Sequence, residues 1–292
     1  MAFARRSTRG AHWRLPVLTL LLSLLLTVLA WQVVSRQVQQ AEASRFERLT
    51  ERVMATVSGR FASATQAVHS ARALLAASED VSREEWAAYV RATSPFFNEG
   101  VVGLGYVERV ARADVPALEA RQRAEGFEGF TVERHGDNPS LYVVPRIEPI
   151  ERNAGALGLD GGSGSNRRRA AETAMREDRA VLSNRIGVIE GDREVPGFLL
   201  FLPVYAKGRP AATVAEREAA LQGWIYASIR MDALTTGLEA VGAHQLDLTV
   251  LEDSQLPGQP PLFETAFALA PRDAQALVNE ASMDVYGRRW LF

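Results

Sequence analysis

Few residues in this chain of 292 residues have the types and spacing that catalysis or metal binding requires. The four histidines, His12, His69, His135 and His244, lie far apart, and no HExxH pair places two of them on one helix face. Cysteine is absent, which excludes disulfides, thiolate zinc sites and a cysteine nucleophile. We therefore expect no metal site and no cofactor.

A glycine-rich segment at residues 155–164 superficially resembles a phosphate-binding loop, because it leads into a helix that begins with three arginines at 167–169. It matches neither GxxxxGKS/T nor GxGxxG. Ser163 is one residue short of a nucleophile elbow, and no strand leads into it. The arginines are typical of a solvated helix face, and Glu84 and Glu85 are typical of a helix cap. We predict that this chain is not an enzyme.

A long helix is predicted after residue 34, because apolar residues recur every three or four positions from Phe46 to about residue 75. A stripe this narrow is typical both of a helix packed on its own domain and of a dimer seam. We predict a homodimer seam, with packing on the chain's own domain as the alternative. The candidate seam residues are Phe46, Leu49, Val53, Val57 and Phe61.

Mixed helices and strands with short connections follow this helix. Ser82 and Glu85 form a capping-box pattern, which predicts a helix start. The strand expected at residues 141–150 carries two prolines, which favour the edge of a sheet or a bulge. The strands expected at 198–205 and 224–229 are arranged like a hairpin. We predict an α+β fold with an antiparallel sheet and helices to one side.

Residues 15–34 carry no charge and are mostly apolar. As a helix this segment is about 30 Å long, the thickness of the hydrocarbon core of a bilayer. We predict an uncleaved membrane anchor, because the run is longer than that of a signal peptide and Leu29-Ala30-Trp31 is a poor cleavage site. The arginines ahead of it favour a cytoplasmic N-terminus, so the rest of the chain is expected outside the cytoplasmic membrane. The net charge of −2 argues against a nucleic-acid partner.

Several segments, taken together in order and spacing, resemble the CHASE domain, an extracytoplasmic sensory domain of bacterial and plant histidine kinases and nucleotide cyclases. The resemblance covers residues 96–253. The matching segments are Ile147–Pro149, Ala156–Asp160, Arg167–Ala170, Ala180–Ser183, Gly197–Tyr205, Thr213–Arg217, Gly223–Ala227 and Arg230–Asp232.

The resemblance implies a PAS-like sensor that binds a small molecule outside the membrane, on a dimer-forming stalk helix. The ligands of plant members are cytokinins, but the acidic pattern of the plant receptors is altered in this chain. The implied division is a cytoplasmic tail, a transmembrane helix, stalk and connecting helices, a membrane-distal PAS-like sensor, and a membrane-proximal α+β unit that is incomplete at its C-terminal end. The corresponding residues are 1–14, 15–34, 35–94, 95–232 and 233–292.

Five residues are candidate ligand contacts. Asp137 is the acid nearest to the position of a ligand-contacting acid in the plant receptors, and Ser183 falls where those receptors carry a functionally sensitive threonine. Tyr142 and Ser183 offer hydrogen bonds, and Phe198 and Leu200 offer one apolar wall. Core packing is the alternative interpretation of the two strand residues.

The chain stops within an expected strand, at Phe292. Family members usually continue into a second membrane helix and a kinase or cyclase. We therefore expect this chain to be the periplasmic sensor part of a longer signalling receptor, of the two-component or diguanylate cyclase type, in the inner membrane of a bacterium. The alternatives are a membrane-anchored envelope scaffold that binds a protein partner, and a tethered exported hydrolase.

Overall fold

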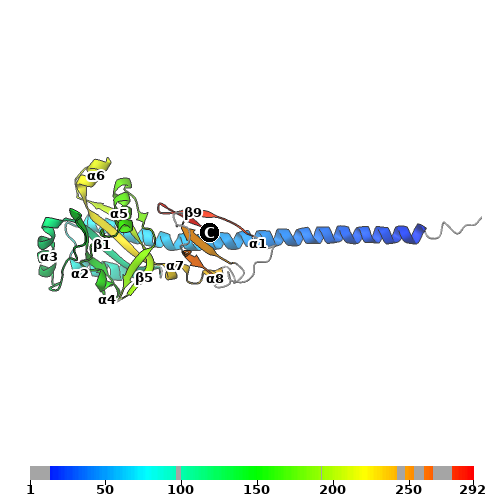
Figure 1. Cartoon of the computed structure of the whole chain (residues 1–292), viewed down its shortest axis with the longest axis horizontal. Coiled ribbons are helices and arrows are strands. Elements are labelled where there is room, and N and C mark those ends of the chain that lie inside the picture. The colour runs from blue at the N-terminus through cyan, green and yellow to red at the C-terminus, as the bar shows by residue number, and fades with distance from the viewer. Residues whose placement is uncertain (1–13, 97–99, 192, 242–246, 253–259, 266–277) are drawn as a thin grey trace, which may run out of the picture. The chain divides into compact units, whose positions relative to one another are not determined.

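The computed structural model describes residues 14–96, 100–191, 193–241, 247–252, 260–265 and 278–292 (Figure 1). Two compact units make up the chain, Met1–Glu51 and Arg52–Phe292. The helix α1 (Arg14–Ala77) begins in the first unit and ends in the second.

In the first unit, α1 exposes a long run of leucines and valines. An 18-residue window of this helix has a mean hydropathy of 2.4, and none of it is buried in the protein. Soluble proteins rarely expose a contiguous apolar surface of this size. The described part of the chain thus contains one helix that is long and apolar enough to cross a membrane.

In the second unit, the apolar stripe of α1 packs against the chain's own strands. Val53, Val57 and Phe61 are buried in one hydrophobic cluster with Phe198 and Trp290. The structure assigns these three helix residues to the core of the domain rather than to a dimer seam. The sequence could not separate the two readings, because both need the same spacing of apolar residues. For Phe46 and Leu49, in the first unit, the dimer seam stays a prediction.

The helices and strands of the second unit form an α+β fold, as predicted. Two helices that follow α1 carry capping boxes, in which a side-chain hydroxyl and a glutamate satisfy free backbone N–H groups at the helix start. One of them is the predicted start at Ser82 and Glu85. The helices are α2 (Arg83–Thr93), α3 (Val115–Ala124), α4 (Ile150–Asn153), α5 (Ser165–Glu177), α6 (Val214–Ala220), α7 (Met231–Thr235) and α8 (Leu238–Val241), with 3-10 turns η1 (Ser94–Phe96), η2 (Arg112–Asp114) and η3 (Ala154–Ala156).

Six strands form the larger sheet, and all of their pairings are antiparallel. They are β1 (Val101–Ala111), β2 (Ser140–Glu148), β3 (Val181–Leu182), β4 (Ile186–Glu190), β5 (Arg193–Tyr205) and β6 (Leu221–Arg230). The order is β2-β1-β6-β5-β3, with β4 also paired to β5. The proline-bearing β2 lies at the edge, as predicted, because proline cannot donate a backbone hydrogen bond to a second neighbour.

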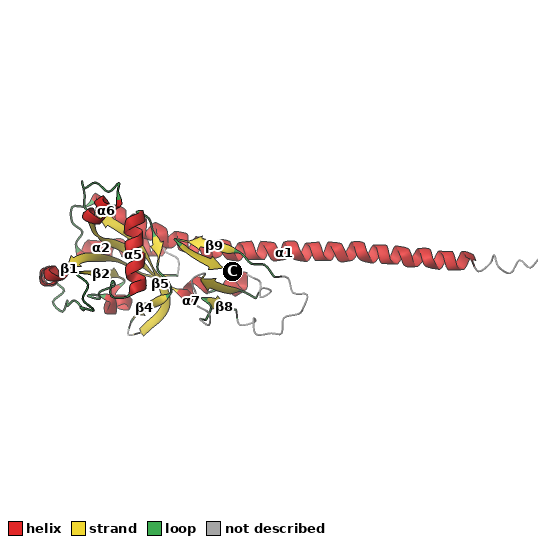
Figure 2. Cartoon of the chain, turned by 45° about the horizontal axis from the view of Figure 1, so that its top comes forward, coloured by secondary structure: helices red, strands yellow, loops and turns green. Residues whose placement is uncertain are grey.

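The two faces of this sheet are covered by different helices (Figure 2). The second-unit part of α1 packs on one face, against alternate residues of β5 and β6. Helix α5 packs on the other face through Ala170, Ala171 and Ala174, whose small side chains let the helix approach the strands closely. The indole Nε1 of Trp224 on β6 donates to the carbonyl of Ala171 at 2.7 Å, which fixes α5 to the sheet.

A smaller sheet of four strands, in the order β8-β7-β10-β9, completes the fold. Its strands are β7 (Thr249–Glu252), β8 (Phe263–Glu264), β9 (Ser282–Val285) and β10 (Arg288–Leu291). Trp290 of β10 contacts the rings of Phe61 and Phe198, both at 5.3 Å between centroids, so both sheets share one core with α1. The division of the chain at residues 232 and 233 into two sensor units stays a prediction.

Candidate ligand-binding site

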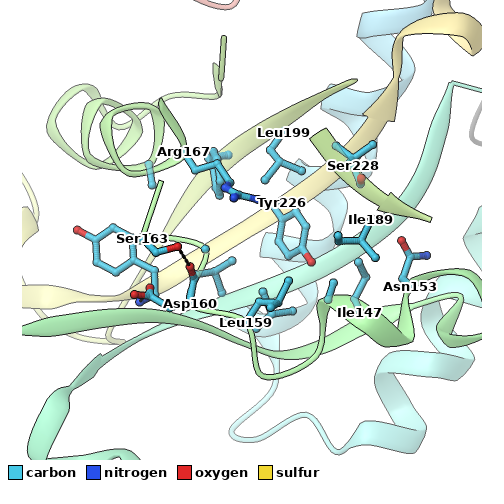
Figure 3. A pocket seen from close by; sticks show the side chains of 18 of the residues that line it. Ile147, Asn153, Leu159, Asp160, Ser163, Arg167, Ile189, Leu199, Tyr226 and Ser228 are labelled. Carbon is cyan, nitrogen blue, oxygen red and sulfur yellow. Dashed lines mark hydrogen bonds between the residues drawn. The ribbon is translucent and has the colours of Figure 1, made fainter. Parts of the chain in front are cut away.

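A cavity of about 140 Å³ lies on the α5 side of the larger sheet (Figure 3). Strands β1, β2, β5 and β6 form one wall, and the segment from α4 to the start of α5, together with β4, forms the other. The apolar lining includes Val144, Ile147, Val188, Ile189, Leu199 and Phe201. An apolar cavity with a few polar groups is typical of small-molecule binding sites.

Two glycines of β1 make room for the polar groups of the sheet wall. Gly105 pairs with Tyr226 across the strands, and a Cβ at Gly105 would lie 2.6 Å from the Tyr226 ring. A Cβ at Gly103 would lie 2.8 Å from the Asn153 side chain. The amide of Asn153 donates to the carbonyls of Val102 and Pro149, at 3.0 and 2.9 Å. The glycines of β1 therefore allow both side chains to occupy the edge of the cavity.

The loop before α5 places Asp160 at the cavity. Gly158 has a φ of +78°, and a Cβ there would lie 2.0 Å from the carbonyl oxygen of Thr131, so this turn requires glycine. Asp160 is only 2% exposed. Its Oδ1 accepts from the backbone N–H groups of Tyr142 and Gly162, both at 2.9 Å. Its Oδ2 is buried and has no hydrogen-bond partner among the described residues.

Two neighbouring arginines at the start of α5 differ in their contacts. Arg168 donates to the carbonyls of Gly162 and Ser140, at 2.8 and 2.9 Å, and its guanidinium lies 4.1 Å from the centre of the Tyr142 ring. It thus holds the loop against β2. Arg167 lines the cavity and extends from α5 toward Tyr226 (Figure 3). Within the described part of the chain, Arg167 makes no hydrogen bond or ion pair.

Two tyrosines line the cavity, and they differ in their hydrogen bonds. Tyr142 donates to Oε1 of Glu172 at 3.3 Å. Burial is the main reason that its pKa rises to about 12. Tyr226 is 3% exposed, and no described residue hydrogen-bonds to its hydroxyl. Burial raises the pKa of Tyr226, and the positive charge of Arg167 opposes the shift. Both phenols are therefore protonated at neutral pH and able to donate.

Of the candidate ligand contacts from the sequence, the structure places one at this cavity, Tyr142. Phe198 and Leu200 lie on the opposite face of β5, in the core with α1, and Leu199 and Phe201 line the cavity instead. Successive side chains of a strand point to opposite faces. Because both faces of β5 are buried, hydrophobicity alone did not identify the residues that face the cavity.

Ser183 and Asp137 lie elsewhere. Ser183 is fully buried; its hydroxyl donates to the carbonyl of Asn184 at 2.8 Å and accepts from the backbone N–H of Leu199 at 3.0 Å. It therefore holds a backbone neighbour of the cavity without lining it. Asp137 is exposed in the turn before β2, where only His135 reaches the lining. A role of either residue in ligand contact stays a prediction.

Sequence reasoning missed Asp160, Arg167 and Tyr226. All three lie in segments that carried the family resemblance, but nothing in their spacing set them apart from their neighbours. The orphaned carboxylate oxygen and the unpaired guanidinium become visible only when the loop, α5 and the sheet are assembled. The described residues contain no group of three or more histidines, aspartates or glutamates placed to hold a metal ion.

The fold resembles that of an extracellular ligand binding receptor from Desulfohalobium retbaense DSM5692, with a TM-score of 0.52 and 12% identity, over 84% of this chain and 39% of that chain. The ligand-binding domain of the Pseudomonas aeruginosa PAO1 amino acid chemoreceptor PctC, in complex with GABA, aligns with a TM-score of 0.44 and 12% identity, over 81% and 91% of the two chains. Methyl-accepting chemotaxis protein X aligns with a TM-score of 0.48 and 13% identity, over 86% and 97%.

The family follows from the sequence itself. Residues 79–263 match the model of the CHASE domain, which is more than half of the chain. The chain belongs to the CHASE domain family. No curated protein matches it significantly.

Proposed function

We propose that this chain is the small-molecule sensor module of a membrane-anchored signalling receptor. The observation that carries the proposal is the cavity on the α5 face of the sheet, where apolar walls surround polar groups that have no partner in the described part of the chain. A buried polar group without a partner destabilises the fold, so a site that keeps such groups is expected to bind a ligand that satisfies them.

The membrane anchor in this proposal is the apolar part of α1. Its 18-residue window of mean hydropathy 2.4 is exposed, which supports insertion into a bilayer. The arginines that precede it favour a cytoplasmic N-terminus. On this reading the sensor lies on the periplasmic side of a bacterial inner membrane, and α1 links it to the membrane.

The receptor in this proposal is longer than the chain. This chain spans 39% of the extracellular receptor chain that it resembles. The output domain is proposed to be a histidine kinase or a diguanylate cyclase. Homodimerisation is proposed through α1 before residue 52, where Phe46 is only partly buried, since Leu49 and the later stripe residues are already buried in the single chain.

Thermal unfolding of the full chain in lipid nanodiscs tests the sensor proposal. A panel of organic acids, amines, amino acids, sugars and nucleobases is screened against the wild type and two variants. Leu199→Trp fills the cavity, and Leu251→Trp adds the same bulk at an exposed position of β7 as a control. A compound at one hundred times its Kd is expected to raise the unfolding temperature by about 5 °C or more.

We expect this shift in the wild type and in the Leu251→Trp variant, and its loss in the Leu199→Trp variant. The proposal is overturned if no compound in the panel stabilises the wild type. It is also overturned if the Leu199→Trp variant keeps the full shift, because the compound then binds somewhere else.

A further inference from the structure

The cavity presents two opposite charges that do not neutralise each other. Asp160 contributes a carboxylate whose Oδ2 has no hydrogen-bond donor, and Arg167 contributes a guanidinium without an ion-pair partner, both judged among the described residues. The two side chains come from the loop and from α5, and both line the same space (Figure 3).

An unsatisfied carboxylate oxygen at this depth is unusual. Buried charges in proteins are normally paired or fully hydrogen-bonded, because removal from water is costly. The Oδ1 atom of the same carboxylate is fully used by the N–H groups of Tyr142 and Gly162. These bonds fix the direction of the carboxylate. Asp160 lines the cavity while Oδ2 itself is covered, so a donor in the cavity reaches this acceptor once the atoms that cover it shift.

Arg167 and Tyr226 provide hydrogen-bond donors in the same cavity. Neither side chain has a hydrogen-bond partner among the described residues, and a guanidinium and a protonated phenol are the donors that a carboxylate needs. The neighbouring Arg168 is not available for this role, because its N–H groups are bound to backbone carbonyls and it pairs with Glu172 at 3.7 Å.

We propose that the ligand is a small zwitterion with a primary ammonium and a carboxylate, that is, a free amino acid. The inference rests on the proposed sensor function and names the ligand class of the same site. The ammonium donates to Oδ2 of Asp160, and the carboxylate accepts from Arg167 and Tyr226. The carbon side chain packs on the apolar wall of Val188, Ile189 and Leu199.

Size and charge exclude several other classes. A cavity of about 140 Å³ has room for roughly ten non-hydrogen atoms, which fits most single amino acids and excludes peptides of three or more residues. A simple anion leaves Asp160 unsatisfied and is repelled by it. A simple amine leaves Arg167 unsatisfied and is repelled by it. A neutral molecule satisfies neither charge fully.

The test is calorimetric titration of the full chain in nanodiscs. The first probes are the twenty proteinogenic L-amino acids and the ω-amino acids from β-alanine to 5-aminopentanoate. The tightest binder is then compared with its own decarboxylated amine and its own deaminated acid; for L-leucine these are 3-methylbutylamine and 4-methylpentanoate. We expect the zwitterion to bind roughly tenfold to a hundredfold more tightly than either analogue.

Two variants assign each charge to its residue. In Asp160→Asn, the preference for the amino acid over its deaminated acid is expected to disappear, while the preference over the amine remains. In Arg167→Gln, the reverse is expected. Asp114→Asn and Arg169→Gln remove the same charges from exposed positions and are expected to keep both preferences. Circular dichroism establishes that each variant is folded, and the half-buried Arg167 gives an independent result if Asp160→Asn does not fold.

The outcomes separate this inference from the sensor proposal. If no amino acid binds but a singly charged or neutral compound of the wider panel does, the zwitterion is overturned and the sensor stands. If nothing in either panel binds, both are overturned. If the amino acid binds but neither variant changes its preference over the two analogues, Asp160 and Arg167 are not its charge partners and the inference fails.

Discussion

The two faces of the larger sheet are both covered by helices and both contribute buried apolar residues, but they differ in their polar groups. On the α1 face, the side chains of β5 and β6 pack in one hydrophobic cluster with Phe61 and Trp290. On the α5 face lies the cavity, where polar groups of Asp160, Arg167 and Tyr226 have no partner among the residues that the structure describes. The proposed site therefore lies on the α5 face, and the α1 face carries the larger hydrophobic cluster.

The largest effect on stability is expected from a large-to-small substitution in the hydrophobic cluster on the α1 face. Trp290→Ala removes the indole that joins Phe61 and Phe198, and we expect the free energy of unfolding to fall by about 3–5 kcal/mol. Urea unfolding of the full chain measures this loss. Phe96→Ala is the control, since Phe96 is 81% exposed and its removal should change stability by about 0.5 kcal/mol or less. Equal effects of the two substitutions would contradict a core shared by both sheets.

Two tyrosine variants distinguish a hydroxyl that contacts the ligand from a hydroxyl that stabilises the fold. Tyr226→Phe removes a hydroxyl to which no described residue hydrogen-bonds, so we expect little change in stability and a loss of amino-acid affinity of roughly fivefold to tenfold. Tyr205→Phe removes a hydroxyl that donates to the carbonyl of Met175 at 2.9 Å, so we expect a loss of about 1 kcal/mol in stability and unchanged affinity.

Urea unfolding and calorimetric titration of both variants measure the two effects side by side. The opposite pattern, in which Tyr226→Phe destabilises the fold and leaves binding intact, would show that the Tyr226 hydroxyl supports the structure and does not contact the ligand.

The smallest expected effect is on the pH dependence of stability. The pKa of Tyr142 is raised to about 12 in the folded protein, above its ordinary value near 10. The unfolded state therefore loses this proton first, so Tyr142 contributes stability below pH 10 that is lost as the pH rises toward 12. In Tyr142→Phe, the fall in unfolding free energy between pH 9 and pH 11 should be smaller than in the wild type. An identical fall in both proteins would contradict a buried, protonated phenol.

Much of the fold could be predicted from local sequence signals. The capping box at Ser82 and Glu85, the prolines of β2 and the helical spacing in α1 each depend on neighbouring residues, and the structure confirms the elements that they predict. Such signals act within one or two turns of a helix or along a single strand, so they can be read without knowing the tertiary structure.

The site could be predicted only in part, because it depends on distant pairings. The choice between Phe198 and Leu199 as the cavity residue depends on which helix covers each face of β5. Whether Val53 and Val57 are buried in the domain depends on strands that are distant in the sequence. Asp160 becomes exceptional only because the N–H groups that bind it leave one of its oxygens free. None of these contacts between distant segments produces a periodic pattern in the sequence, so none could be predicted from it.

The alternation along β5 also makes the domain easy to re-engineer. Leu199 and Phe201 face the cavity, whereas Phe198 and Leu200 belong to the closed core. A mutant library confined to the cavity residues of this strand would therefore sample new specificities without disturbing the residues that hold the two sheets together. Along β5, the positions proposed for ligand contact alternate with positions of the hydrophobic cluster, so that each set can vary while the other stays constant.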